Sequence, residues 1–117
     1  MDPTSLAAAR ARAREWLASL RRELDALAEQ QSLTSHDDEH DPEGVTIAVQ
    51  RAQLQGLLEA AERESEELDR AADRMAAGSY GRCTVCGGPI APERLEALPA
   101  ARTCISCASD PRRRRRR

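Results

Sequence analysis

The sequence predicts a mainly α protein: a long antiparallel coiled-coil hairpin followed by a small four-cysteine zinc-finger module. Two heptad patterns of apolar residues before Gly78 predict the hairpin. Two Cys-x-x-Cys pairs after it predict the module. The composition agrees, because the 117 residues contain no Phe, one Trp and one Tyr. So few large side chains cannot fill a large mixed core, whereas helices rich in Ala, Leu, Glu and Arg need none.

The first helix is expected from about Ser5 to Gln31. Asp2, Thr4 and Ser5 are suitable capping residues, and Pro3 is tolerated in a first helical turn. Apolar residues recur at intervals of seven, with a second row between them, which is the pattern of a coiled-coil seam. The first row is Leu6, Ala13, Leu20 and Leu27, the second row is Leu17 and Leu24, and Trp16 lies beside them.

The second helix is expected from about Thr46 to Ala77, and Gly78 should end it, as glycine commonly does at a helix C-terminus. It carries its own row of apolar residues at intervals of seven: Ile47, Leu54, Ala61, Leu68 and Met75, joined by Leu57, Leu58, Ala71 and Ala72. At a rise of about 1.5 Å per residue the two helices would extend over roughly 40 and 48 Å. They can therefore pair along most of their length.

We interpret residues 1–77 as an antiparallel hairpin within one chain, and expect the protein to be a monomer. A pair formed between two chains stays open as an alternative, because heptads alone do not determine the partner. The connection, residues 32–45, should be an acidic tip loop, kept out of regular helix by Pro42 and Gly44. Its five acids are Asp37, Asp38, Glu39, Asp41 and Glu43.

The acidic tip has more than one chemical interpretation. Charged loops are usually only solvated, and acids before a helix also interact favourably with its N-terminal dipole. Carboxylates are also the ligands that Mg²⁺ prefers, which gives the tip a functional interpretation. His36 and His40 lie among these acids and could form a second metal site with them, although histidines in loops usually are not ligands.

The four cysteines, Cys83, Cys86, Cys104 and Cys107, predict one structural zinc ion. Seventeen residues separate the two pairs, which is within the range for a four-cysteine site. Gly87 and Gly88 can adopt the turn that directs backbone N–H groups at thiolate sulfur. Four thiolates leave no open position for a catalytic water. Disulfides would require an oxidising compartment and an export signal, and we recognise none.

The C-terminus ends in six arginines that conceal the acidity of the rest. The formal net charge is −2, but residues 1–111 have 12 arginines and 20 carboxylates, a net charge of −8. We expect residues 109–117 to be a disordered tail that either contacts phosphates or acidic protein surface without sequence specificity, or is inert. No apolar run approaches a membrane span, and we expect a cytoplasmic protein. The six arginines of the C-terminal tail are Arg112, Arg113, Arg114, Arg115, Arg116 and Arg117.

The cysteine segment resembles the DksA/TraR-type zinc-finger family. The resemblance rests on Tyr80-Gly81-x-Cys83-x-x-Cys86-Gly87-x-x-Ile90, on Arg94-Leu95-x-Ala97-x-Pro99 and on Cys104-x-x-Cys107, and it covers residues 78–108. It implies direct binding to bacterial RNA polymerase, with the coiled coil entering the secondary channel and the acidic tip reaching the active centre. Within the module we expect Arg94 to pair with a carboxylate or a backbone carbonyl, and Ile90, Leu95 and Leu98 to fill a small core.

The tip resembles that of short actinobacterial members, and the family pattern is Asp-x-x-Asp-x-Ala. Asp38 and Asp41 supply the two acids, with Glu43 in place of the alanine. The alternative register places Asp41 at the first acid and Gly44 at the second. Longer members add a helix after the last cysteine pair, whereas this sequence continues directly into Ser109, Asp110, Pro111 and the arginines.

Two functions follow as expectations. The first is a transcription regulator that acts through RNA polymerase, with zinc holding the base of the hairpin and the acidic tip as the effector. The second is a zinc-containing nucleic-acid-binding or scaffold module that acts through the arginine tail. We do not expect an enzyme, because no nucleophile–base pair or open metal position can be assembled from the sequence.

Overall fold

The computed structural model has two long helices followed by three short ones. It describes the backbone of residues 2–34 and 42–114 and the side chains of residues 2–33 and 45–112. The long helices are α1 (Pro3–Thr34) and α2 (Pro42–Ala77). The short helices are α3 (Pro92–Ala97), α4 (Ile105–Ser109) and α5 (Pro111–Arg114). No strand forms among these described residues. An isolated antiparallel bridge joins Arg82 to Pro89. The expected fold class is confirmed.

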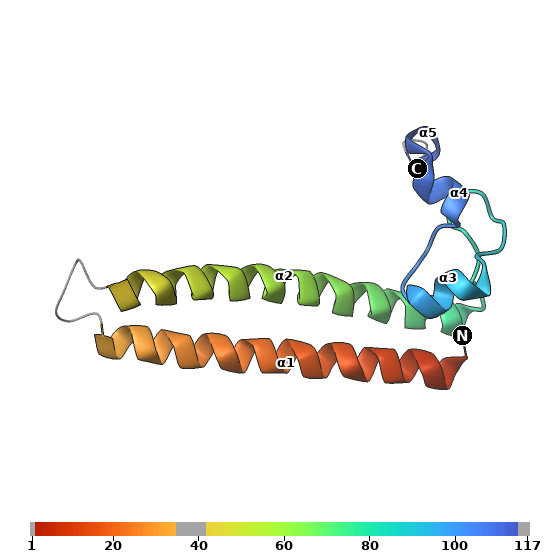
Figure 1. Cartoon of the computed structure of the whole chain (residues 1–117). Helices are drawn as coiled ribbons and strands as arrows, with labels where there is room; N and C mark the ends of the chain where they lie inside the picture. Colours follow the sequence, from red (N-terminus) through yellow and green to blue (C-terminus); the bar gives the residue numbers. More distant parts are fainter. Residues whose placement is uncertain (1, 35–41, 115–117) are drawn as a thin grey trace. The chain divides into compact units, whose positions relative to one another are not determined.

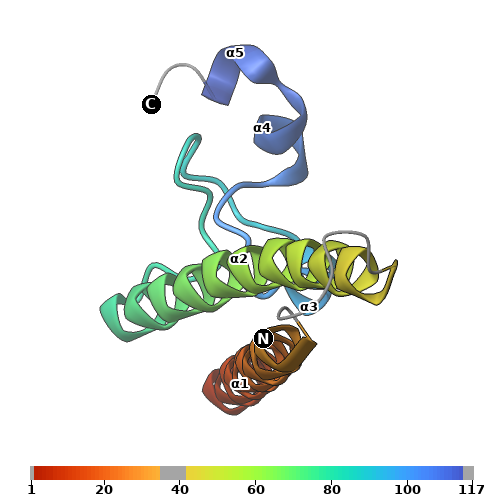
Figure 2. The same cartoon turned by 90° about the vertical axis from the view of Figure 1, so that its left-hand side faces the viewer.

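The chain divides into two compact units. We call Arg12–Arg63 the hairpin unit, and Met1–Ala11 together with Glu64–Arg117 the finger unit. In the hairpin unit, α1 and α2 run antiparallel, as Figure 1 shows, and Figure 2 presents the end at which α1 stops and α2 begins. Among the described residues of this unit, Leu20, Ile47 and Ala61 are buried. Arg21 pairs with Glu62 across the two helices, with Nη2 and Oε1 3.8 Å apart.

In the finger unit, the first turns of α1 lie beside the last turns of α2. Arg10 donates from Nε and Nη2 to one carboxylate oxygen of Asp69, at 3.1 and 2.9 Å. The cross-helix ion pairs of both units join residues of one chain, so opposite charges help to set the antiparallel register. The buried apolar residues around this pair are Leu6, Ala9, Leu68 and Ala71.

The helix ends explain where the long elements start and stop. Helix α1 begins at Pro3, and the carboxylate of Asp2 accepts a 2.7 Å hydrogen bond from the N–H of Ser5. This bond is the main reason that the pKa of Asp2 lies below its ordinary value. Helix α2 ends at Ala77, and the φ of the next residue, Gly78, is +79°. The N–H of Gly78 bonds Met75 O, and the N–H of Ser79 bonds Arg74 O, which is the Schellman arrangement.

The start of α2 differs from the sequence-based expectation. We expected Pro42 and Gly44 to remain outside regular helix, but α2 already begins at Pro42. That expectation was wrong because proline fits the first helical position, where its missing N–H costs nothing. Four of the tip acids, Asp37, Asp38, Glu39 and Asp41, lie outside the described residues, as do His36 and His40. Glu43 is the second residue of α2.

Candidate metal centre

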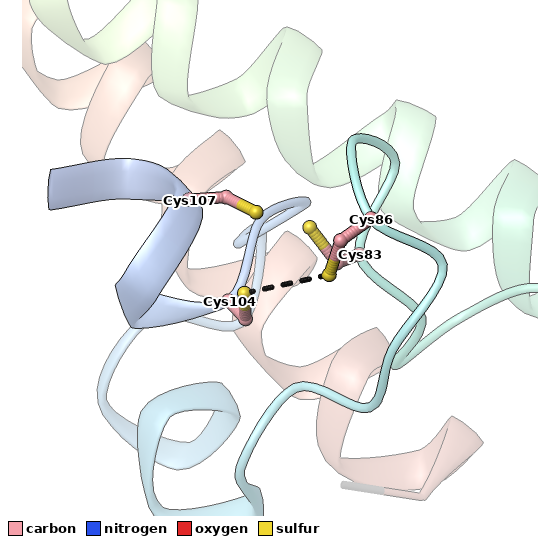
Figure 3. A group of neighbouring side chains, drawn as sticks. All are labelled: Cys83, Cys86, Cys104 and Cys107. Atoms are coloured by element: carbon pink, nitrogen blue, oxygen red, sulfur yellow. Dashed lines mark hydrogen bonds between the residues drawn. The ribbon is translucent and has the colours of Figure 1, made fainter. Parts of the chain in front are cut away.

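Four cysteines from two segments of the finger unit converge. Cys83 and Cys86 lie on the loop that follows α2, Cys104 precedes α4, and Cys107 lies within it. Their sulfur atoms point toward one another in Figure 3 and all lie within 4.8 Å of each other. The Sγ atoms of Cys86 and Cys104 are 3.8 Å apart. No other group of three or more potential metal-binding side chains occurs among the described residues.

The donor set fits zinc. Tetrahedral zinc with Zn–S bonds of about 2.3 Å holds its sulfurs about 3.8 Å apart, which is the Cys86–Cys104 separation. A disulfide would need about 2.0 Å, and none of the four cysteines forms one. With four thiolate donors, one zinc ion would be fully coordinated and would play a structural role. The expected zinc cofactor is therefore supported by the geometry of the site.

Backbone turns create the two cysteine pairs. The N–H of Cys83 bonds Gly88 O at 2.8 Å and the N–H of Gly87 bonds Cys83 O at 2.9 Å, which closes a tight loop around Cys86. Gly87 sits at φ +74°, where a side chain would be strained. The N–H of Val85 then approaches the sulfur of Cys83 at 3.4 Å, and that of Gly88 approaches the sulfur of Cys86 at 3.4 Å. These contacts agree with the turn chemistry expected of the glycines.

The same backbone contacts favour the thiolate form. Burial is the largest single effect on Cys83 and raises the pKa of its thiol. Hydrogen bonds to its sulfur from the backbone N–H groups of Cys86, Cys104 and Val85 outweigh burial and lower that pKa to about 6. The N–H of Cys107 is the main cause that lowers the pKa of Cys104. Because zinc binds the thiolate, these N–H groups reduce the competition from protons near neutral pH.

A small apolar core lies beside the cysteines. Ile90 and Leu95 are buried with Cys83 and Cys107, as expected for the first two. Leu98 was also expected in this core, but its side chain is 51% exposed. That expectation was wrong because α3 ends at Ala97, and Leu98 instead lines an open groove of about 710 Å³ with Ile105. Partly buried side chains complete the core: Tyr80, Val85, Ala101 and Cys104.

Two side chains tie the module together through backbone oxygens. The Nε of Arg94 donates to Thr103 O at 2.9 Å, which confirms that Arg94 pairs with a backbone carbonyl within the module. The hydroxyl of Tyr80 donates to Pro99 O at 2.9 Å, a contact that we did not predict. Burial raises the pKa of this hydroxyl. The sequence did contain a signal for this hydrogen bond, because Tyr80 lies close to the cysteines and a half-buried tyrosine hydroxyl usually has a partner.

The C-terminal segment is described only as far as Arg114. Pro111–Arg114 forms the short helix α5, where we expected an unstructured tail. The N–H of Arg112 bonds the carboxylate of Asp110 at 2.9 Å, and Arg112 is exposed. Arg115, Arg116 and Arg117 lie outside the described residues. None of the described helices combines the length and the apolar character needed to cross a membrane.

Comparison with known proteins identifies relatives of the chain. General stress protein 16O of Bacillus subtilis (strain 168) is 32% identical over 95 residues, which are 80% of this chain and 58% of that protein. An uncharacterised protein of Aquifex aeolicus (strain VF5) is 41% identical over 44 residues, 38% of this chain and 30% of that protein. The chain thus spans between about a third and three fifths of the length of these relatives.

A solved structure supports the fold. The structure of transcription factor DksA2 from Pseudomonas aeruginosa superposes with a TM-score of 0.59 and 23% sequence identity, covering 99% of this chain and 89% of the other. A family model for the prokaryotic dksA/traR C4-type zinc finger matches residues 78–113, the segment that contains all four cysteines. The resemblance stated from the sequence is thereby confirmed for the segment that carries it: residues 78–113 match the DksA/TraR C4-type zinc finger.

Proposed function

We propose that this protein is a transcription regulator that binds bacterial RNA polymerase and inserts the acidic end of its helical hairpin into the secondary channel. The observation that carries the proposal is the combination of a DksA/TraR C4-type zinc finger with a preceding two-helix hairpin. The protein with a similar fold, DksA2, is described as a transcription factor. A relative is described as a general stress protein, which agrees with a regulatory role.

In this proposal the zinc centre and the tip have separate tasks. Zinc, bound by four thiolates, stabilises a module too small to fold on its apolar core alone, and takes no part in chemistry. The tip acids, above all Asp38 and Asp41, act on the polymerase active centre, either by meeting its basic side chains or by changing the surroundings of its Mg²⁺. The protein itself catalyses no reaction, acts as a monomer in the cytoplasm, and changes promoter output through polymerase.

The proposal is tested by charge reversal at the tip. We expect Asp38→Lys combined with Asp41→Lys to remove the effect on transcription in vitro, while co-purification with polymerase core enzyme largely survives. Glu59→Lys combined with Glu64→Lys is the matched control, because both are exposed acids of α2 far along the sequence from the tip. The control should keep both activities. Failure of the unaltered protein to bind core enzyme would contradict the proposal.

A further inference from the structure

Positive charge is concentrated in the C-terminal third of the chain. Residues 78–117 contain nine arginines and three carboxylates, a formal net charge of +6. Residues 1–77 contain nine arginines and 17 carboxylates, a formal net charge of −8. Residues 78–111 hold three of these arginines and all three carboxylates, so the excess positive charge belongs to the six arginines at positions 112–117. This arginine-rich end is attracted to polyanions whatever the charge of the rest of the chain, because screening limits the reach of charges to about 10 Å.

Most of the arginines that serve the fold can be recognised by their partners. Arg10, Arg21 and Arg70 form ion pairs with carboxylates of α2. In the finger unit, Arg74 and Arg94 donate to the backbone oxygens of Ala100 and Thr103.

Arg82 and Arg102 differ from these five arginines. Both are exposed, and their guanidinium groups make no hydrogen bond or ion pair within the described part of the chain. The fold therefore does not explain their presence.

The backbone brings the segments that carry these two arginines side by side. Cys83 is buried, whereas its neighbours Arg82 and Thr84 are exposed, so the arginine points away from the metal centre. The N–H of Thr84 bonds Arg102 O at 2.8 Å, which brings the second segment alongside the first. Arg102 is exposed between Ala101 and Thr103, which are partly buried. The two guanidinium groups thus start from adjacent segments on the outer side of the first cysteine pair.

Helix α5 begins the run of terminal arginines. It packs against α4, which carries Cys107, and its exposed Arg112 is the first of the six terminal arginines. We call Arg82 and Arg102 the knuckle face. The knuckle face offers two guanidinium groups, whereas stable protein–protein interfaces have an apolar, aromatic-rich centre. A surface that offers only guanidinium donors suits a ligand that offers only charged oxygen acceptors.

We propose that the knuckle face binds the sugar-phosphate backbone of duplex DNA, without reading its sequence. Arginine forms bidentate hydrogen bonds with phosphate, and each contact releases condensed counterions from the DNA. The arginines after Arg112 add charge to the same end of the chain. Sequence-specific reading in the major groove requires an element that enters it, and the described helices of the module have only six, five and four residues. This binding goes beyond the proposed action on polymerase and does not depend on it.

The experiment measures DNA binding by the full-length, zinc-loaded protein in the absence of polymerase. Fluorescence anisotropy with a short labelled duplex of mixed sequence is recorded over a series of salt concentrations. The slope of log affinity against log salt should become about 2 less steep in Arg82→Gln combined with Arg102→Gln, because each lost phosphate contact removes roughly one unit. Arg22→Gln combined with Arg63→Gln, two exposed arginines of the hairpin unit, should keep the original slope.

Two further variants keep the result interpretable. Arg82→Lys combined with Arg102→Lys keeps both charges and should retain nearly the full slope, and zinc content is measured for every variant to verify folding. Deletion of 112–117 should reduce the slope further but leave a part that depends on Arg82 and Arg102. The proposal is overturned if the glutamine variant keeps the original slope, if the deletion alone removes all binding, or if single-stranded RNA competes better than duplex DNA.

Discussion

At the residue scale, the four cysteines differ in their exposure to solvent. Cys83 and Cys107 are 3% and 0% exposed and belong to the apolar core, whereas Cys86 is exposed. A bound zinc ion would therefore join two thiolates of the apolar core to two that are exposed or partly exposed. In a module of this size, the free energy of metal binding supplies much of the free energy of folding.

We accordingly expect Cys86→Ser to reduce zinc from one ion per chain to a small fraction of that, and to unfold the module, because one of four thiolates is lost. Metal analysis of the purified protein measures the first effect, and protease sensitivity between residues 78 and 110 measures the second. Ser106→Ala is the control, since Ser106 is an exposed residue between Cys104 and Cys107. Full zinc occupancy in Cys86→Ser would show that three thiolates suffice.

At the element scale, the end of α2 determines how the chain enters the metal centre. The Schellman arrangement at Gly78 uses both the N–H of Gly78 and that of Ser79, so the helix stops at a defined residue. Only five residues, 78–82, then separate α2 from Cys83. A displaced helix end would therefore misplace the first cysteine pair.

We expect Gly78→Ala to destabilise the protein by about 1 kcal/mol, because alanine is strained in the left-handed conformation. A Cβ at this position would meet no atom within 4 Å, so backbone conformation alone sets the cost. Gly56→Ala is a control of opposite sign, because Gly56 lies inside α2 with equally open surroundings and helix propensity favours alanine there. Urea unfolding followed by circular dichroism compares them. If both substitutions changed the free energy of unfolding equally and in the same direction, this account would be refuted.

At the scale of the whole molecule, zinc and helix pairing stabilise different parts of the chain. The short helices that surround the cysteines have six, five and four residues, against 32 and 36 for α1 and α2. The long helices are stabilised by their own apolar seam and ion pairs, with buried residues such as Leu20 and Leu68.

Removal of zinc with a strong chelator should therefore lower the helical circular dichroism signal by less than about a fifth, since the short helices need the metal and the long ones are held by packing. The readout is the spectrum before chelation, after it and after zinc is restored. Loss of most of the signal would mean that the hairpin also depends on the metal.

The sequence predicted the regular parts of the molecule better than the irregular ones. Heptads and cysteine spacing are local patterns, so they indicated two long helices and a four-thiolate site. Helix α3, the exposure of Leu98 and the bond from Tyr80 to Pro99 were not predicted. They depend on how the zinc-bound loops fold back on one another, and no periodicity records such contacts. The start of α2 was misjudged because proline was read as a helix breaker rather than as a first helical residue.

The two aromatic residues of the chain fall in different units. Trp16 belongs to the hairpin unit and is 52% exposed, whereas Tyr80 belongs to the finger unit and packs against the cysteine core. With no other tryptophan or tyrosine in 117 residues, each unit contains one intrinsic fluorophore. Excitation at the red edge of the aromatic band reports on the hairpin alone, and tyrosine emission reports on the metal module. The protein can therefore be followed optically, one unit at a time, without any label.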